Sequence, residues 1–228
     1  MLLNSYGCGR AYAISVVDDH VKLHVTGEVR VLSKPVLLVI DMQHDFVDRA
    51  GAVPCHGASS AVPKIRTLVE RAHETSIPVI YTKELHRSNK VDFGRELDGD
   101  SPLHCVEGTR GAEIVEDLSP EEKDYVIGKR RYSCFIGTDL LILLKGLGVD
   151  VLYLTGAATD VCVHLTAMDA HQLDYKVKIV EDCVAGTSKA AHKAALAAVE
   201  RLQTGSVIRS SVALKDFEEN SIQSQAPR

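Results

Sequence analysis

Short apolar runs in this chain are followed by side chains that can take part in catalysis. In chain order these side chains are Asp41, the pair Glu84 and His86, Lys129, and Cys162. Ionised cysteine is a nucleophile, a carboxylate can accept the proton of its thiol, and an ammonium can stabilise the anion that forms. Asp41, Lys129 and Cys162 would then act as base, cation and nucleophile.

Cys162 has two interpretations. Thr159 or Asp160 is suited to cap a helix that begins there, and Cys162 would lie in its first turn. The positive end of a helix lowers the pKa of a thiol at that position. The alternative is a buried structural cysteine, since valines flank it. A carboxylate and an ammonium after neighbouring apolar runs favour the nucleophile.

These side chains must be positioned by strands, because the apolar runs are continuous rather than alternating. The runs lie at 36–40, 78–81, 125–127, 151–154, 177–180 and 207–208. Continuous runs suit strands that are buried on both faces of a parallel sheet. Helical patterns alternate with them at 61–74, 138–145, 160–173 and 189–202. This alternation predicts an α/β layer sandwich with its site beyond the carboxyl ends of the strands.

The chain has three predicted parts. Residues 1–34 contain apolar residues that alternate with polar ones on both sides of Asp18-Asp19, which predicts a β-hairpin-like N-terminal extension with one apolar face. Residues 35–215 form the catalytic domain. Residues 216–228 are polar, and we expect them to be a frayed tail.

Composition restricts the function. The 26 basic and 31 acidic residues give a net charge of −5, which disfavours nucleic acid as a partner. No apolar run is long enough to span a membrane, and no signal peptide is visible. The six cysteines include no C-x-x-C pair, which favours free thiols in a reducing compartment. A cytoplasmic protein without membrane partners is expected.

Three segments resemble the cysteine hydrolases of the isochorismatase-like superfamily, which includes nicotinamidase, N-carbamoylsarcosine amidohydrolase and biuret hydrolase. The segments are LLVIDMQHDF at 37–46, GKRRYS at 128–133 and TGAATDVCV at 155–163. The resemblance implies a three-layer sandwich whose six-stranded, mostly parallel sheet has helices on both faces. It also implies a catalytic triad of Asp41, Lys129 and Cys162, a cis peptide between Ala157 and Ala158, and an oxyanion hole formed by the backbone N–H groups of Ala158 and Cys162.

The resemblance implies a reaction as well. A thiol nucleophile favours hydrolysis of an amide C–N bond over cleavage of the vinyl ether of isochorismate, which needs no thiol. Asp41 would take the proton of Cys162, the thiolate would attack the carbonyl carbon, and a thioester would form with release of ammonia. Segments 91–99 and 129–133 are more like those of carbamoyl and ureide hydrolases, so a biuret-like amide is the leading substrate.

The pocket is harder to assign. Phe46, Glu84 and His86 are the predicted substrate-binding residues, although Phe46 could instead be plain core. No cofactor is expected, but Glu84, His86, Asp92 and His104 are candidate ligands of a divalent metal, since carboxylate and imidazole both bind such ions. The alternatives are therefore a metal-dependent carboxamide hydrolase of the nicotinamidase type, and a non-catalytic member that serves as a binding module.

We predict a homo-oligomer, a dimer or tetramer, in which the N-terminal extension contributes to the subunit contact. An apolar face is rarely left in water, and members of the family it resembles commonly oligomerise. Deleting residues 1–32 should lower the mass measured by light scattering to that of the monomer. An unchanged mass in a folded variant would contradict this and favour a hairpin that covers the sheet edge of its own subunit.

Overall fold

The computed structural model describes residues 10–17, 20–28, 33–99 and 101–225. The chain divides into two units, Met1–Ser33 and Lys34–Arg228. In the first unit, β1 (Arg10–Val17) pairs antiparallel with β2 (His20–Glu28), with Val17 opposite His20. This confirms the predicted hairpin, while its turn at Asp18-Asp19 lies outside the described residues.

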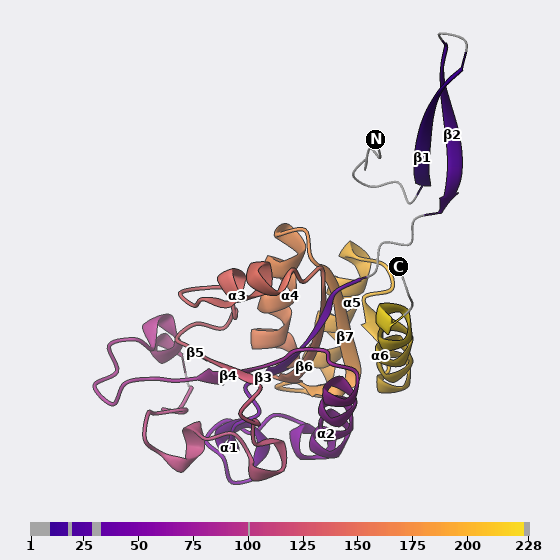
Figure 1. Ribbon diagram of the computed structural model, residues 1–228. Helices are drawn as coiled ribbons and strands as arrows, with labels where there is room; N and C mark the ends of the chain where they lie inside the picture. Colours follow the sequence, from indigo (N-terminus) through magenta and orange to yellow (C-terminus); the bar gives the residue numbers. More distant parts are fainter. Residues whose placement is uncertain (1–9, 18–19, 29–32, 100, 226–228) are drawn as a thin grey trace. The chain divides into compact units, whose positions relative to one another are not determined.

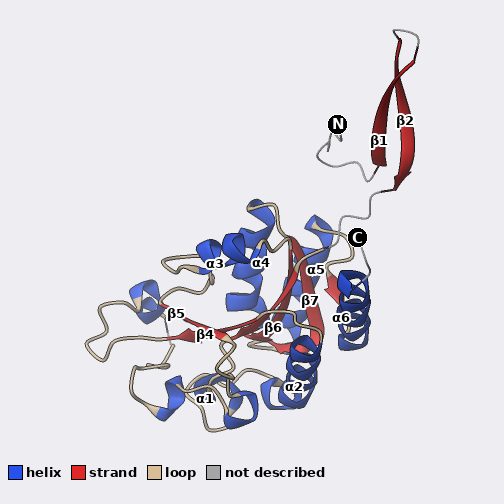
Figure 2. Cartoon of the chain, in the orientation of Figure 1, coloured by secondary structure: helices blue, strands red, loops and turns tan. Residues whose placement is uncertain are grey.

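The second unit is built on a parallel sheet (Figures 1 and 2). Within the described part of residues 34–228, six strands lie in the order β5-β4-β3-β6-β7-β8, and each neighbouring pair is parallel. Their bounds are β3 (Pro35–Ile40), β4 (Val79–Glu84), β5 (Tyr125–Lys129), β6 (Val151–Ala157), β7 (Lys176–Ala185) and β8 (Val207–Ile208). The strand order reverses between β3 and β6, and ligand crevices form beyond the carboxyl ends of strands at such a point.

Helices cover both faces of the sheet, as the sequence predicts. Alternate residues of β3 belong to different cores, with Leu37 and Val39 on one face and Val36, Leu38 and Ile40 on the other. Because both faces are buried, the strand has a continuous apolar sequence. The first face packs on α2 and α6 and the second on α3, α4 and α5, with bounds α2 (Ala58–Glu74), α3 (Leu140–Leu147), α4 (His164–Gln172), α5 (Lys189–Leu202) and α6 (Ser210–Gln225).

Short helical segments complete the second unit. Helix α1 (His44–Val47) follows β3, and 3₁₀ turns lie at Gly94–Asp98, Arg110–Ala112 and Glu116–Leu118. A π-helical turn at Thr159–Val163 leads into α4. Among the described residues, no helix has the length and hydropathy that a bilayer-spanning segment needs.

The C-terminal residues differ from the prediction. Instead of a frayed tail from residue 216, α6 continues to Gln225. Phe217 is completely buried, and its ring lies edge-on to that of Tyr153, with centroids 4.9 Å apart. The Tyr153 hydroxyl donates to Asp216 Oδ2 at 2.8 Å. A single buried aromatic residue, Phe217, holds this helix to the sheet. The sequence did not predict the helix because the rest of 216–228 is mostly polar.

The contact of Phe217 with the core is testable. Phe217→Ala should lower the free energy of unfolding by about 3–5 kcal/mol, because a large side chain is removed from a packed site. The measurement is urea unfolding followed by circular dichroism. Ile222→Ala on the same helix is the matched control, since Ile222 is 71% exposed and should change stability by no more than about 0.5 kcal/mol. Equal effects of the two variants would show that α6 is not anchored by Phe217.

Candidate active site

The candidate catalytic side chains come from the carboxyl ends of four neighbouring strands. Asp41 follows β3, Glu84 is the last residue of β4, Lys129 is the last residue of β5, and Cys162 follows β6. All four are buried. Glu84 and Lys129 are opposite each other in the β4–β5 register, which places their side chains on the same rim of the sheet.

The ammonium of Lys129 lies at the centre of this group. Its Nζ is 2.6 Å from Asp41 Oδ2, 3.4 Å from Glu84 Oε2 and 3.4 Å from Cys162 Sγ. One carboxylate oxygen of Asp41, one of Glu84 and the sulfur of Cys162 all lie within 4.8 Å of one another. The structure therefore brings together the three residues of the predicted triad and adds Glu84 to them.

The backbone holds Asp41 in an uncommon conformation. Its φ is +50°, and its N–H donates to the carbonyl oxygen of Thr82 at 3.2 Å. The Thr82 hydroxyl in turn donates to Asp41 Oδ1 at 2.7 Å. On the other side, a Cβ at Gly156 would lie 1.9 Å from the carbonyl oxygen of Ile40, so only glycine allows β6 to approach the end of β3. These contacts leave Asp41 Oδ2 facing Lys129.

Cys162 lies in the predicted first helical turn, but the predicted caps are wrong. Ala158 is the residue before the turn, and no side chain caps it. The Thr159 hydroxyl instead lies 2.9 Å from His192 Nδ1, and the carboxylate of Asp160 accepts from the backbone N–H of Thr187 at 2.8 Å. Both polar side chains are thus used to fasten the turn to the α5 region. The peptide between Ala157 and Ala158 is cis, as the resemblance implies.

Burial raises the pKa of the Cys162 thiol well above its usual value. Lys129 acts in the opposite direction, but the negative charges of Asp41 and Glu84 add to the effect of burial. The expected lowering by the helix end is therefore outweighed, because it neglected desolvation and two carboxylates. This shift favours the neutral thiol, so ionisation of Cys162 calls for a base.

The two carboxylates are shifted in opposite directions. Burial raises the pKa of Asp41, although Lys129 acts to lower it. Burial acts in the same sense on Glu84, but there Lys129 and the imidazoles of His104 and His86 hold the pKa well below its usual value. Glu84 therefore stays ionised while Asp41 is the better proton acceptor, which is the separation that acid–base chemistry requires.

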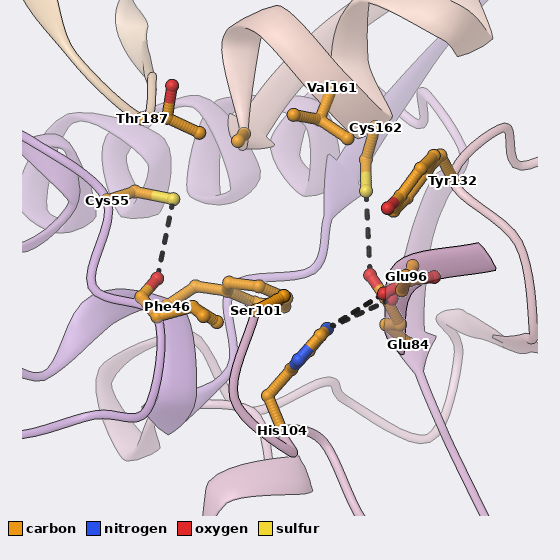
Figure 3. A pocket seen from close by; sticks show the side chains of 12 residues that line it. Phe46, Cys55, Glu84, Glu96, Ser101, His104, Tyr132, Val161, Cys162 and Thr187 are labelled. Atoms are coloured by element: carbon orange, nitrogen blue, oxygen red, sulfur yellow. Dashed lines mark hydrogen bonds and ion pairs between the residues drawn. The ribbon is translucent and has the colours of Figure 1, made fainter. Parts of the chain in front are cut away.

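A cavity of ≈ 130 Å³ opens onto the sulfur of Cys162 (Figure 3). Figure 3 shows the thiol pointing towards Glu84, with Tyr132 beside it. Phe46, Val53 and Val161 contribute apolar surface, and Glu84, Glu96 and His104 form a polar wall. The cavity has room for a small substrate with one or a few polar groups.

The predicted substrate-binding residues are placed differently from one another. Phe46 and Glu84 line the cavity, whereas His86 is not one of its lining residues. His86 lies behind Glu84, with its Nε2 3.0 Å from Glu84 Oε1, and its ring stacks on Phe93 with centroids 3.9 Å apart. Sequence reasoning missed Glu96, which lies in a short 3₁₀ turn of the loop after β4, where no periodic pattern could have located it.

The candidate metal ligands are also only partly as predicted. Donor atoms of four residues lie within 4.8 Å of one another: Glu84, His86, Glu96 and His104. Asp92 was predicted in place of Glu96, but its carboxylate accepts from the backbone N–H of Arg87 at 3.0 Å and from the guanidinium of Arg87 at 2.8 Å. Two imidazoles and two carboxylates fit a divalent ion such as zinc.

The same four side chains also satisfy one another without an ion. His104 Nε2 lies 3.3 Å from Glu96 Oε2 and 3.5 Å from Glu84 Oε1. Burial alone would lower the pKa of His104, but Glu84 and Glu96 raise it to about 10. A metal ion would therefore have to displace a proton from His104, since only a neutral imidazole coordinates metal.

Comparisons with known proteins agree with this geometry. Residues 35–211 match the model of the Isochorismatase domain. A probable inactive nicotinamidase of Arabidopsis thaliana is 36% identical over 69% of this chain and 84% of its own length. The ureidoacrylate amidohydrolase of Methylobacterium radiotolerans is 30% identical over 72% of either chain. The solved structure of an isochorismatase-like hydrolase from Alkaliphilus metalliredigens has a TM-score of 0.75 and 33% identity, covering 81% of this chain and all of that one. The chain belongs to the isochorismatase family.

Proposed function

We propose that this protein is a cysteine amidohydrolase that cleaves a C–N bond of a small carbamoyl or ureide amide, such as biuret, and releases ammonia. The observation that carries the proposal is the contact of the Lys129 ammonium with both Asp41 Oδ2 and Cys162 Sγ, together with the small cavity that Cys162 lines. Base, cation and nucleophile are thus within reach of one bound carbonyl carbon. The ureide-cleaving relative supports the substrate class.

The first half of the reaction forms a thioester. Asp41 takes the proton of the Cys162 thiol, and the sulfur then attacks the carbonyl carbon of the substrate. The oxygen that becomes negative is stabilised by the backbone N–H groups of Ala158 and Cys162. When the tetrahedral intermediate collapses, the C–N bond breaks and the nitrogen takes the proton from Asp41, so that ammonia leaves.

The second half returns the enzyme to its starting state. Asp41 takes a proton from a water molecule, and the hydroxide attacks the thioester carbon. The C–S bond breaks, and the sulfur of Cys162 recovers the proton from Asp41. Lys129 remains protonated throughout and stabilises whichever of its neighbours is negative, while the ionised Glu84 balances its charge.

The first alternative is a carboxamide hydrolase with a bound divalent metal. It rests on the proximity of Glu84, His86, Glu96 and His104, and an ion held there would act as a Lewis acid towards a polar atom of the substrate. The second alternative is a non-catalytic binding module. It is considered because the Arabidopsis relative is named a probable inactive nicotinamidase. The presence of all three predicted triad side chains, with Lys129 in contact with both Asp41 and Cys162, favours an enzyme over this second alternative.

A panel of small amides tests the proposed reaction. The native protein should release ammonia fastest from a ureide such as biuret, and more slowly from nicotinamide. Cys162→Ala and Cys162→Ser should each lower turnover about 10³-fold or more, because the nucleophile is lost. Cys55→Ser is the matched control, since Cys55 lines the same cavity without contacting Lys129 in the described structure. More than a few per cent of activity in either Cys162 variant would refute the thioester mechanism.

The division of roles between the carboxylates is tested by alkylation. Asp41→Asn should lower kcat about 10²–10⁴-fold, because the proton carrier is removed. Iodoacetamide should nevertheless modify Cys162 faster at pH 7 in this variant, since the Asp41 charge raises the pKa of the thiol. Peptide mass spectrometry gives the modification rate. Glu84→Gln is the comparison: it should also speed alkylation, but cost less turnover. A larger loss of turnover in Glu84→Gln than in Asp41→Asn would make Glu84 the base.

A further inference from the structure

We propose that the pocket selects neutral amides rich in N–H groups, that it rejects amides carrying a carboxylate, and that Glu96 is the residue that determines this preference. The inference rests on the proposed function, because it concerns the substrate of the same site. It differs from the chemistry of the ureidoacrylate-cleaving relative, whose named substrate is an acid.

The charge on the cavity wall is the first argument. Glu84 and Glu96 line the cavity together with one imidazole, that of His104, and no lysine or arginine is found among its described lining residues. All three side chains are at least nine-tenths buried, so their charges are weakly screened by solvent. The remaining wall is largely apolar, with Phe46 and Val161. The imidazolium of His104 is already paired with both Glu84 and Glu96. A substrate carboxylate would therefore lose its hydration beside two carboxylates without gaining an unpaired cation.

The nearby cations are already engaged. Lys129 is in contact with Asp41 and Glu84, so its charge is matched by two anions. The Arg131 guanidinium donates to the carbonyl oxygen of Asp92 at 2.7 Å, and that of Arg130 pairs with Glu107 and Asp92. These contacts direct both arginines to the loop that carries Asp92. Neither arginine is among the described residues that line the cavity.

Glu96, rather than Glu84, has a carboxylate oxygen available to bind the substrate. Both carboxylate oxygens of Glu84 already have partners: Oε1 contacts the imidazoles of His86 and His104, and Oε2 contacts the ammonium of Lys129 and the thiol of Cys162. Glu96 lies in the 3₁₀ turn Gly94–Asp98, and its Oε2 contacts His104 at 3.3 Å. Within the described residues, Glu96 Oε1 has no such partner. Because Glu96 lines the cavity, we infer that this oxygen accepts from the N–H groups of a ureide.

A pair of substrates that differ only in charge tests the inference. N-carbamoylglycinamide and N-carbamoylglycine have nearly the same size, but the first ends in a neutral amide and the second in a carboxylate. In protein treated with EDTA, kcat/KM for release of ammonia from the carbamoyl group should favour the amide by about tenfold or more, chiefly through KM. Mass spectrometry of the products shows which bond is cleaved. A preference for the carboxylate would overturn the inference.

Glu96→Gln removes the charge at constant size and should reduce this preference about fivefold or more, through a lower KM for the carboxylate. Asp98→Asn is the matched control, because Asp98 is in the same turn and pairs with Arg95 outside the cavity. It should leave the preference unchanged. An unaltered preference in Glu96→Gln, or an equal change in Asp98→Asn, would show that Glu96 is not the determinant.

Binding separates this inference from the proposed function. Titration calorimetry with Cys162→Ala measures the affinity for both compounds without turnover, and the amide should bind about tenfold or more tightly. If the native protein hydrolyses neither compound nor biuret, the proposed function fails, while the affinity ratio still decides the selectivity. Equal affinities, or no binding of the amide, would overturn the selectivity even if turnover is found.

Discussion

The arrangement of the site depends on one buried ammonium. Lys129 has no solvent exposure, and a buried ammonium is tolerated only with anions and hydrogen-bond acceptors close to it. Asp41, Glu84 and the carbonyl oxygen of Arg131 satisfy this demand at 2.6, 3.4 and 3.1 Å. Strands β3, β4 and β5 must therefore end in register, because each of them delivers one member of the group. The same contact places the charge of Lys129 beside the sulfur of Cys162.

Asp41 and Glu84 share the ammonium of Lys129, and their other partners explain why their pKa values are shifted in opposite directions. Glu84 has two imidazoles as further donors on Oε1, so its anion is stabilised from both sides. Asp41 has the hydroxyl of Thr82 on Oδ1 and the shared ammonium on Oδ2. Both carboxylates lose hydration when they are buried, but the hydrogen bonds and charges around Glu84 stabilise its anion more than those around Asp41 do. The proton of the thiol is therefore better accepted by Asp41, although Glu84 Oε2 is only 3.6 Å from the sulfur.

Features that arise from local sequence patterns could be predicted, whereas features that arise from contacts between distant segments could not. The strands and the proximity of Asp41, Lys129 and Cys162 were predictable. Continuous apolar runs followed by polar residues indicate buried strands with a functional rim, and the three family-like segments contain these three residues. The raised pKa of Cys162 was not, since it depends on burial and on charges from three other strands. Phe217 was missed because one buried ring decides the position of a helix that is otherwise polar.

Glu96 could not be found from the sequence for a different reason. Its place depends on contacts that fold the loop after β4 back onto the sheet. The ring of Phe93 stacks on His86, and Arg131 holds the carbonyl oxygen of Asp92. The first contact is within the loop and the second joins the loop to the segment after β5, and no periodic pattern in the sequence reveals either. A loop held in this way brings the carboxylate of Glu96 to the cavity wall on a single short 3₁₀ turn.

Hydrogen bonds of a buried side chain tie the ends of β3 and β4 together. The side chain of Gln43 donates to the carbonyl oxygens of Glu84 and Ala112, each at 2.8 Å, and its own oxygen accepts from the backbone N–H of Glu84 at 2.8 Å. This buried amide continues the hydrogen bonding between β3 and β4 past the end of β3, next to Asp41. The residues proposed for bond cleavage are thus held by the sheet, whereas Glu96 and His104 of the cavity wall come from the loop after β4. A change in the loop can then alter which amide is accepted while the chemistry at Cys162 stays the same.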